Sequence, residues 1–210
     1  MSGVLCVYGE HRYEKVIEKS RFITTCKHVE SEEEAREFIS KIRTEFSDAT
    51  HNCFAFVADK LGNLMRFSDD GEPQGTAGMP ILDAIRGKKL FHTAVVVTRY
   101  FGGIKLGAGG LVRAYSSSTS ECLDQAEKRE YQLCSKYSII VGYELADLIK
   151  KFLSQNDCTL DDTEYLDKVK FIVAVKSQKS QEFCQKLTDF AVGRVQFEKI
   201  DEYYFPFKAE

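Results

Sequence analysis

Runs of apolar and β-branched residues alternate with helical patterns from the N-terminus to about residue 130. The runs predict strands at residues 22–28, 52–59, 64–70 and 91–101. Apolar residues at helical spacing predict helices at residues 31–46 and 110–130, and a short helix in residues 80–90 that is ended by Gly87. Ser31 and Glu34 have the spacing of a capping box, which predicts where the first helix begins.

The pattern restarts at about Ser135 and predicts a strand, a helix, two strands, a helix and a strand. These elements cover residues 136–143, 144–156, 158–167, 168–176, 180–193 and 194–207. The order β-α-β-β-α-β is that of a ferredoxin-like domain. We therefore expect an α+β protein with two domains, residues 1–134 and 135–210, that meet near residues 130–136.

Five of the 14 glycines lie between Gly102 and Gly110, after a predicted strand and before a predicted helix. Backbone N–H groups at a helix start attract anions, and glycine lets the backbone approach a phosphate closely. The candidates for such an anion site are Arg99, Gly102, Gly103, Lys105, Gly107, Gly109, Gly110 and Arg113. The spacing is neither that of a P-loop nor that of the dinucleotide fingerprint. The alternative is that the glycines serve tight turns and close helix packing alone.

Three carboxylates, Asp69, Asp70 and Glu72, lie where a segment rich in glycine and proline begins. Their oxygen atoms could hold Mg²⁺, or two of them could share acid–base work. They could equally cap backbone N–H groups or pair with the cations of the glycine segment. The sequence leaves these alternatives open.

His51 precedes Cys53 by two residues, so both side chains point to the same side of a strand. A cysteine–histidine pair can serve as nucleophile and base, but a buried free cysteine is usually inert. We expect His51 at the edge of a cleft that it shares with the two loops.

Charge and composition narrow the function classes. The chain has 29 basic and 32 acidic residues and a net charge of −3, so an anion site must be a local patch. No apolar stretch is long enough to span a membrane and no signal-peptide pattern is found, so we expect a cytoplasmic protein without membrane contact. The seven cysteines are widely spaced and odd in number. They predict free thiols, and neither a metal nor a cofactor is expected.

Four segments in order resemble the YigZ/Impact family. They are KSRFI (19–23), DATHNCFAF (48–56), FSDDGEPQGTAGMPIL (67–82) and VVVTRYFGGIKLGAGGLVRAY (95–115). The resemblance covers roughly residues 15–128, and the tail from about residue 136 is similar to the small C-terminal domain of bacterial YigZ-type members.

The resemblance implies two folds and a biological setting. The N-terminal domain would resemble domain 2 of a small-subunit ribosomal protein, a sheet with helices on one face. The C-terminal domain would resemble a terminal domain of the translocation factor EF-G. A link to translation control is implied, with a ribosome, an RNA or a translation-associated protein as partner.

These observations predict a non-enzymatic regulatory or binding protein that acts near the translation machinery through an anion-binding cleft. The alternative is an enzyme for a phosphate-bearing or peptide-like small molecule, with Mg²⁺ held by the acidic residues. A third reading is a scaffold whose C-terminal sheet docks a protein. No set of nucleophile and base is recognised in the sequence, which favours a binding protein over an enzyme.

Overall fold

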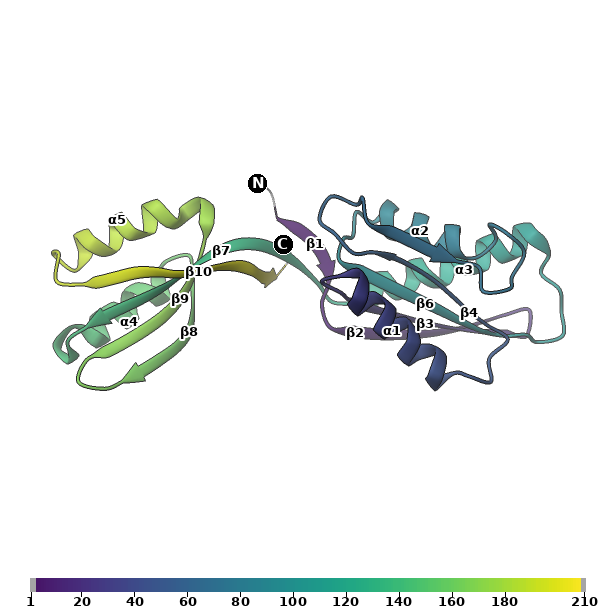
Figure 1. Cartoon of the computed structure of the whole chain (residues 1–210), viewed down its shortest axis with the longest axis horizontal. Coiled ribbons are helices and arrows are strands. Elements are labelled where there is room, and N and C mark those ends of the chain that lie inside the picture. Colours follow the sequence, from purple (N-terminus) through teal and green to yellow (C-terminus); the bar gives the residue numbers. More distant parts are fainter. Residues whose placement is uncertain (1–2, 209–210) are drawn as a thin grey trace. The chain divides into compact units, whose positions relative to one another are not determined.

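The structure, a computed structural model, describes residues 3–208 (Figure 1). They form two compact units that divide between Glu130 and Tyr131. The outermost residues of the two predicted domains, 1–2 and 209–210, lie outside the described residues.

The N-terminal unit contains six of the strands and three helices among the described residues. In chain order they are β1 (Val4–Val7), β2 (Glu10–Ile17), β3 (Ser20–His28), α1 (Glu32–Glu45), β4 (His51–Val57), β5 (Met65–Ser68), α2 (Gly78–Gly87), β6 (Thr93–Tyr100) and α3 (Gly107–Gln125). Five strands form an antiparallel sheet in the order β2-β3-β6-β4-β5. The strand β6 comes last of these five in the sequence, yet it lies at the centre of the sheet.

Helices cover both faces of this sheet, which corrects the expectation of helices on one face. Val95 and Val97 of β6 belong to a core that contains residues of α2 and α3. Ala94 and Val96 belong to a second core, which contains residues of α1. The two helical layers are visible on opposite sides of the sheet in Figure 1. Successive side chains of a strand point to opposite faces, and both faces of β6 are covered, so every residue of β6 except Tyr100 is buried.

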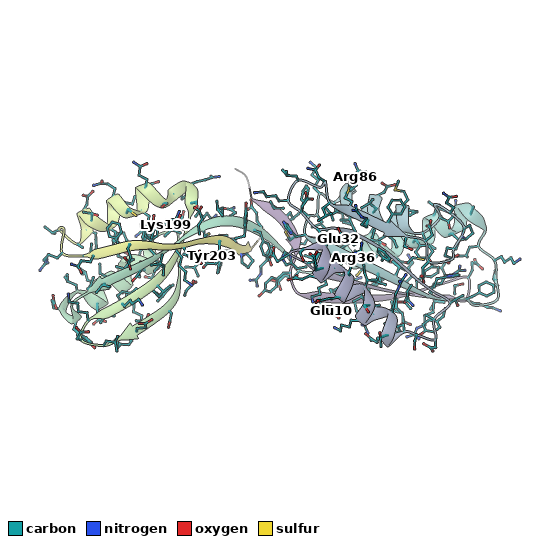
Figure 2. The ribbon with its side chains drawn as sticks, viewed as in Figure 1. Glu10, Glu32, Arg36, Arg86, Lys199 and Tyr203 are labelled. Atoms are coloured by element: carbon teal, nitrogen blue, oxygen red, sulfur yellow. The ribbon has the colours of Figure 1, made fainter. Side chains whose placement is uncertain are left out.

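The first helix begins as the capping pattern predicts. The Ser31 hydroxyl accepts a hydrogen bond from the Glu34 N–H at 3.2 Å, although the Glu34 carboxylate accepts from the N–H of Glu30 instead. Ion pairs cover its outer surface, where Arg36 contacts Glu32 at 2.6 Å (Figure 2). This surface of α1 is therefore occupied by paired charges and is no candidate for a site.

The C-terminal unit has the predicted order β-α-β-β-α-β. Its elements are β7 (Lys128–Val141), α4 (Tyr143–Gln155), β8 (Cys158–Tyr165), β9 (Val169–Lys176), a short 3₁₀ turn (Ser177–Lys179), α5 (Ser180–Phe190) and β10 (Gln196–Lys208). The strands follow the order β10-β7-β9-β8, and β7 also pairs with β1. Both helices contribute to one core on a single face of the sheet. The ferredoxin-like fold is confirmed, with β7 starting three residues before the division between the units.

Candidate functional site

The predicted site residues lie where three adjacent strands of the N-terminal sheet end. In the pairing of β3, β6 and β4, Phe22 lies opposite Arg99, and Arg99 lies opposite His51. The acidic loop (residues 69–77) connects β5 to α2, and the glycine segment (residues 101–110) connects β6 to α3. The sheet thus brings the two predicted motifs to the same region.

Arg99 is buried and paired with an acid of the acidic loop. Its guanidinium donates to Glu72 Oε1 at 2.7 Å and to the Ser20 hydroxyl at 3.2 Å. Arg99 is 4% exposed and Glu72 is 8% exposed, so the pair is shielded from solvent. The guanidinium also lies 5.4 Å from the ring centre of Phe22. Arg99 therefore pairs with the acidic loop inside the protein, as one of the sequence alternatives proposed. Its buried guanidinium is not available to an anion from outside.

Tyr115 of α3 joins this pair, and sequence reasoning did not single it out. Its hydroxyl donates to Glu72 Oε1 at 2.8 Å, and burial raises the pKa of Tyr115 well above its usual range. The helical spacing with Leu111 and Ala114 predicts that Tyr115 faces the core. A buried tyrosine hydroxyl needs a hydrogen-bond partner. This requirement is the feature of the sequence that could have indicated a polar partner for Tyr115.

Cys53 is a buried thiol beside the same cluster. Its S–H lies 3.0 Å from the carbonyl oxygen of Asp69 and 3.4 Å from the Tyr115 hydroxyl. Burial, with smaller contributions from the charges of Glu72 and Asp70, raises the pKa of Cys53 to about 12. Because the thiolate is the nucleophilic form, Cys53 is not an activated nucleophile.

His51 lies at the edge of the buried cluster and is partly exposed. Its Nδ1 is 2.8 Å from the carbonyl oxygen of Asp70, and its Nε2 is 3.8 Å from Glu72 Oε1. His51 and Cys53 thus contact different partners, so the geometry does not show a nucleophile–base pair.

The three carboxylates of the acidic loop point to different partners. Asp69 accepts from the N–H groups of Gly75, Ala77 and Gly78 at 2.8, 3.0 and 2.8 Å. Burial alone would raise the pKa of Asp69, but these three hydrogen bonds hold it below its ordinary value. Asp69 thereby satisfies donors at the start of α2.

Asp70 is held by α1 and β4. One of its oxygen atoms accepts from Arg43 at 2.7 Å, and the other accepts from the Asn52 N–H at 2.6 Å. With Glu72 bound to Arg99 and Tyr115, the three acids do not converge on one point. Within residues 3–208, no cluster of three histidine, cysteine or acidic side chains is arranged to hold a metal ion.

The glycine segment combines a close backbone contact with an open helix start. A Cβ at Gly102 would stand 2.0 Å from the Lys19 carbonyl carbon, so only glycine fits there. Gly103 and Gly107 have φ values of +86° and +70°. Gly107, Gly109 and Gly110 lie in the first turn of α3. This turn contains no acidic residue, and no side chain caps the helix start.

A groove with a volume of about 870 Å³ lies beside this helix start. Its lining includes Lys105 and Arg113 from the glycine segment and α3, and Lys15 from β2. Lys15 pairs with Glu121 at 2.5 Å, whereas the Lys105 and Arg113 side chains are exposed and have no hydrogen-bond or ion-pair partner in the described part of the chain. Apolar side chains share the lining, namely Ile17, Ile104, Leu106 and Val112.

The structure therefore divides the predicted residues between two places. Lys105, Gly110 and Arg113 line the groove, with Gly107 and Gly109 in the same helical turn. Arg99, Glu72 and their neighbours form the buried cluster, and Gly102 makes the close contact with the β2–β3 turn. The groove is the exposed candidate for binding, and the cluster joins the acidic loop to β6 and to α3, which lines the groove.

Comparison with known proteins identifies the family. Residues 18–123 match the model of the Impact N-terminal domain, and residues 139–194 match a domain of unknown function, DUF1949. The chain is 41% identical to the IMPACT family member YvyE of Bacillus subtilis, covering 89% of this chain and 85% of that protein. It is 38% identical to the IMPACT family member YigZ of Escherichia coli, covering 89% and 92%. The chain belongs to the IMPACT family.

A solved structure supports the assignment. The crystal structure of a hypothetical protein, 35% identical, aligns with a TM-score of 0.62 over 96% of this IMPACT family chain and 98% of the other. Among the described residues, no helix has both the length and the apolar character that crossing a membrane requires.

Proposed function

We propose that this IMPACT family protein is a non-enzymatic binding protein that contacts phosphate groups of the translation machinery through the groove beside α3. The observation that carries the proposal is a pair of exposed cations, Lys105 and Arg113, that have no partner within residues 3–208 and line a groove of about 870 Å³. Cations that lack an internal partner are available to a phosphate. A ribosome, whose surface is rich in RNA phosphate, is the partner that this chemistry and a cytoplasmic setting favour.

The contacts of the acidic loop favour binding over catalysis. Asp69 and Asp70 accept hydrogen bonds at both carboxylate oxygens, and Glu72 Oε1 accepts from Arg99 and Tyr115. Cys53 is buried with a raised pKa, and His51 contacts the Asp70 carbonyl oxygen and Glu72 rather than the thiol. These features support a role for the acidic loop in bracing the groove.

Co-sedimentation with purified ribosomes tests the proposal. The protein is expected to pellet at low salt and to dissociate at moderate salt, because phosphate contacts release counterions. A Lys105→Glu/Arg113→Glu variant should lose pelleting. The matched control, Arg86→Glu/Lys89→Glu, makes the same change of charge at the end of α2, where Arg86 is labelled in Figure 2, and should pellet as the wild type does.

Two results would contradict the proposal. If no pelleting occurs even at low salt, the ribosome is not the partner. If both variants lose pelleting equally, the effect follows from net charge and not from the groove.

A further inference from the structure

Three connections meet at one end of the C-terminal unit, and we name this region the loop end. They join β7 to α4 (Gly142), β8 to β9 (residues 166–168) and α5 to β10 (residues 191–195). Because β7 and β8 both run antiparallel to β9, these connections emerge at the same end of the sheet, as Figure 1 shows.

A pocket of about 260 Å³ is lined by residues from all three connections. Its lining includes Gly142, Lys168 and Arg194. Lys168 and Arg194 are exposed, and within the described residues neither side chain has a hydrogen-bond or ion-pair partner. The pocket therefore presents two free positive charges.

Two tyrosine rings are exposed at the loop end, outside the lining of the pocket. Tyr143 follows Gly142 and is 56% exposed, and Tyr165 at the end of β8 is 59% exposed. The Tyr143 hydroxyl donates to the carbonyl oxygen of Leu166 at 2.5 Å, which fixes the ring against the β8–β9 connection. A ring that is held in place on the surface loses little further freedom when a ligand stacks on it.

The charge of the loop end limits which ligand it suits. Glu144 in the first turn of α4 and Asp167 in the β8–β9 connection balance Lys168 and Arg194. A balanced surface does not attract an extended phosphate backbone or an anionic membrane over a distance. It can hold one or two phosphates in direct contact, provided that another interaction adds affinity.

We propose that the loop end binds a short segment of single-stranded RNA. A phosphate occupies the pocket between Lys168 and Arg194, and an unpaired base stacks on Tyr143 or Tyr165. Aromatic rings next to a cationic pocket are the combination by which proteins bind single-stranded nucleic acid, and bases in a duplex cannot reach such rings. The inference rests on residues of the C-terminal unit and does not depend on the groove beside α3.

The test measures binding of the full chain to a labelled 12-nucleotide single-stranded RNA, with the matching duplex as a second probe. Tyr143→Ala/Tyr165→Ala should weaken single-strand binding by about tenfold or more. Tyr143→Phe/Tyr165→Phe keeps both rings and loses only the hydroxyl that holds Tyr143 in place. This variant should therefore bind much more tightly than the alanine variant. Lys168→Glu/Arg194→Glu should reduce the salt dependence by about 0.7 for each lost phosphate contact. The control Lys150→Glu/Lys151→Glu changes the same charge elsewhere on α4 and should have little effect.

Cross-linking locates the contact directly, even where a variant fails to fold. A 5-bromouridine RNA irradiated with the wild-type chain should attach to the peptide that contains Tyr143 or the one that contains Tyr165. Cross-links confined to other peptides would overturn the proposal.

The outcomes separate this proposal from the function proposed above. If Lys105→Glu/Arg113→Glu abolishes RNA binding and the loop-end variants do not weaken it, the loop end is not an RNA contact and the groove stands. If the loop-end variants alone lose RNA binding, the loop end stands, and the groove is decided separately by ribosome pelleting of Lys105→Glu/Arg113→Glu. If the tyrosine variant loses ribosome pelleting but keeps its affinity for the RNA, the partner is a protein and the proposal is wrong.

Discussion

At the scale of single residues, the contact between Arg99 and Glu72 decides which charges of the N-terminal unit are free. The sequence presents Arg99, Lys105 and Arg113 as equivalent cations around a glycine cluster. Burial separates them, since an ion inside a protein needs a partner and an ion on the surface does not. Only the fold shows that Arg99 is the cation that points inward from the central strand.

The buried pair yields a prediction about stability. Arg99→Met leaves the Glu72 carboxylate buried without its cation, and we expect a loss of about 3–5 kcal/mol in the free energy of unfolding. Adding Glu72→Gln to this variant removes the unpaired charge and should recover part of the loss. Urea denaturation at neutral pH measures both changes. A single variant as stable as the wild type would show that the pair does not contribute in this way.

Part of the buried cluster could be predicted from the sequence. Pairing between the acidic loop and the cations was one of the alternatives, but three acids and three cations allow several pairings. Which acid reaches which cation depends on the path of the loop, and loop paths have no periodic signal. Tyr115 was missed for another reason, because a tyrosine at an apolar helical position is read first as a core residue.

At the scale of elements, α2 depends on an acid that lies outside the helix. Asp69 binds three N–H groups around the start of α2, eight to nine residues away at Ala77 and Gly78. Capping patterns in a sequence are local and span three or four residues, so this contact has no short-range signature. The predicted helix nevertheless ends at the glycine where α2 ends, because Gly87 is a local signal.

The capping role of Asp69 gives a pH-dependent prediction. Its pKa is lower in the folded chain than in the unfolded one, so its contribution is complete above about pH 4 and is lost as the pH falls through the folded value. Asp69→Asn should reduce the free energy of unfolding by about 0.5–2 kcal/mol at pH 7. Denaturant titrations from pH 7 to pH 3 should show the two proteins converging as the wild-type carboxyl becomes protonated. A constant difference across this range would contradict the assigned role.

Strands at the margins of the fold were harder to predict than those at the centre. The central strand β6 has a continuous apolar run, whereas β2 alternates between exposed and half-buried positions and carries charge on both faces. Residues 128–130 were expected to extend a helix, yet α3 ends at Gln125 and β7 begins at Lys128. Charged residues there fit either state, and pairing with other strands decides between them.

At the scale of the whole molecule, each compact unit has a core of its own. Ile85 and its neighbours fill a core of the N-terminal unit, and Leu187 lies in the core of the C-terminal unit. The order of elements made the ferredoxin-like fold predictable. The second helical layer of the N-terminal sheet was not, because the number of faces covered follows from how the strands are ordered in space.

Separate cores predict separable unfolding. Leu187→Ala and Ile85→Ala each remove a fully buried side chain and should cost about 2–5 kcal/mol. In differential scanning calorimetry, each substitution is expected to lower one transition and to leave the other near its wild-type temperature. If either substitution shifts all of the heat absorption together, the two units unfold as one.

The central position of β6 also has a consequence for folding during synthesis on the ribosome. The strands β3 and β4 have no partner on their inner sides until β6 fills the gap between them. At about 5–20 residues per second, synthesis leaves those two edges open for an interval on the order of seconds. Open strand edges are where chains associate wrongly. The yield of folded protein therefore depends on how soon β6 emerges from the exit tunnel, a dependence on timing that the finished sheet no longer shows.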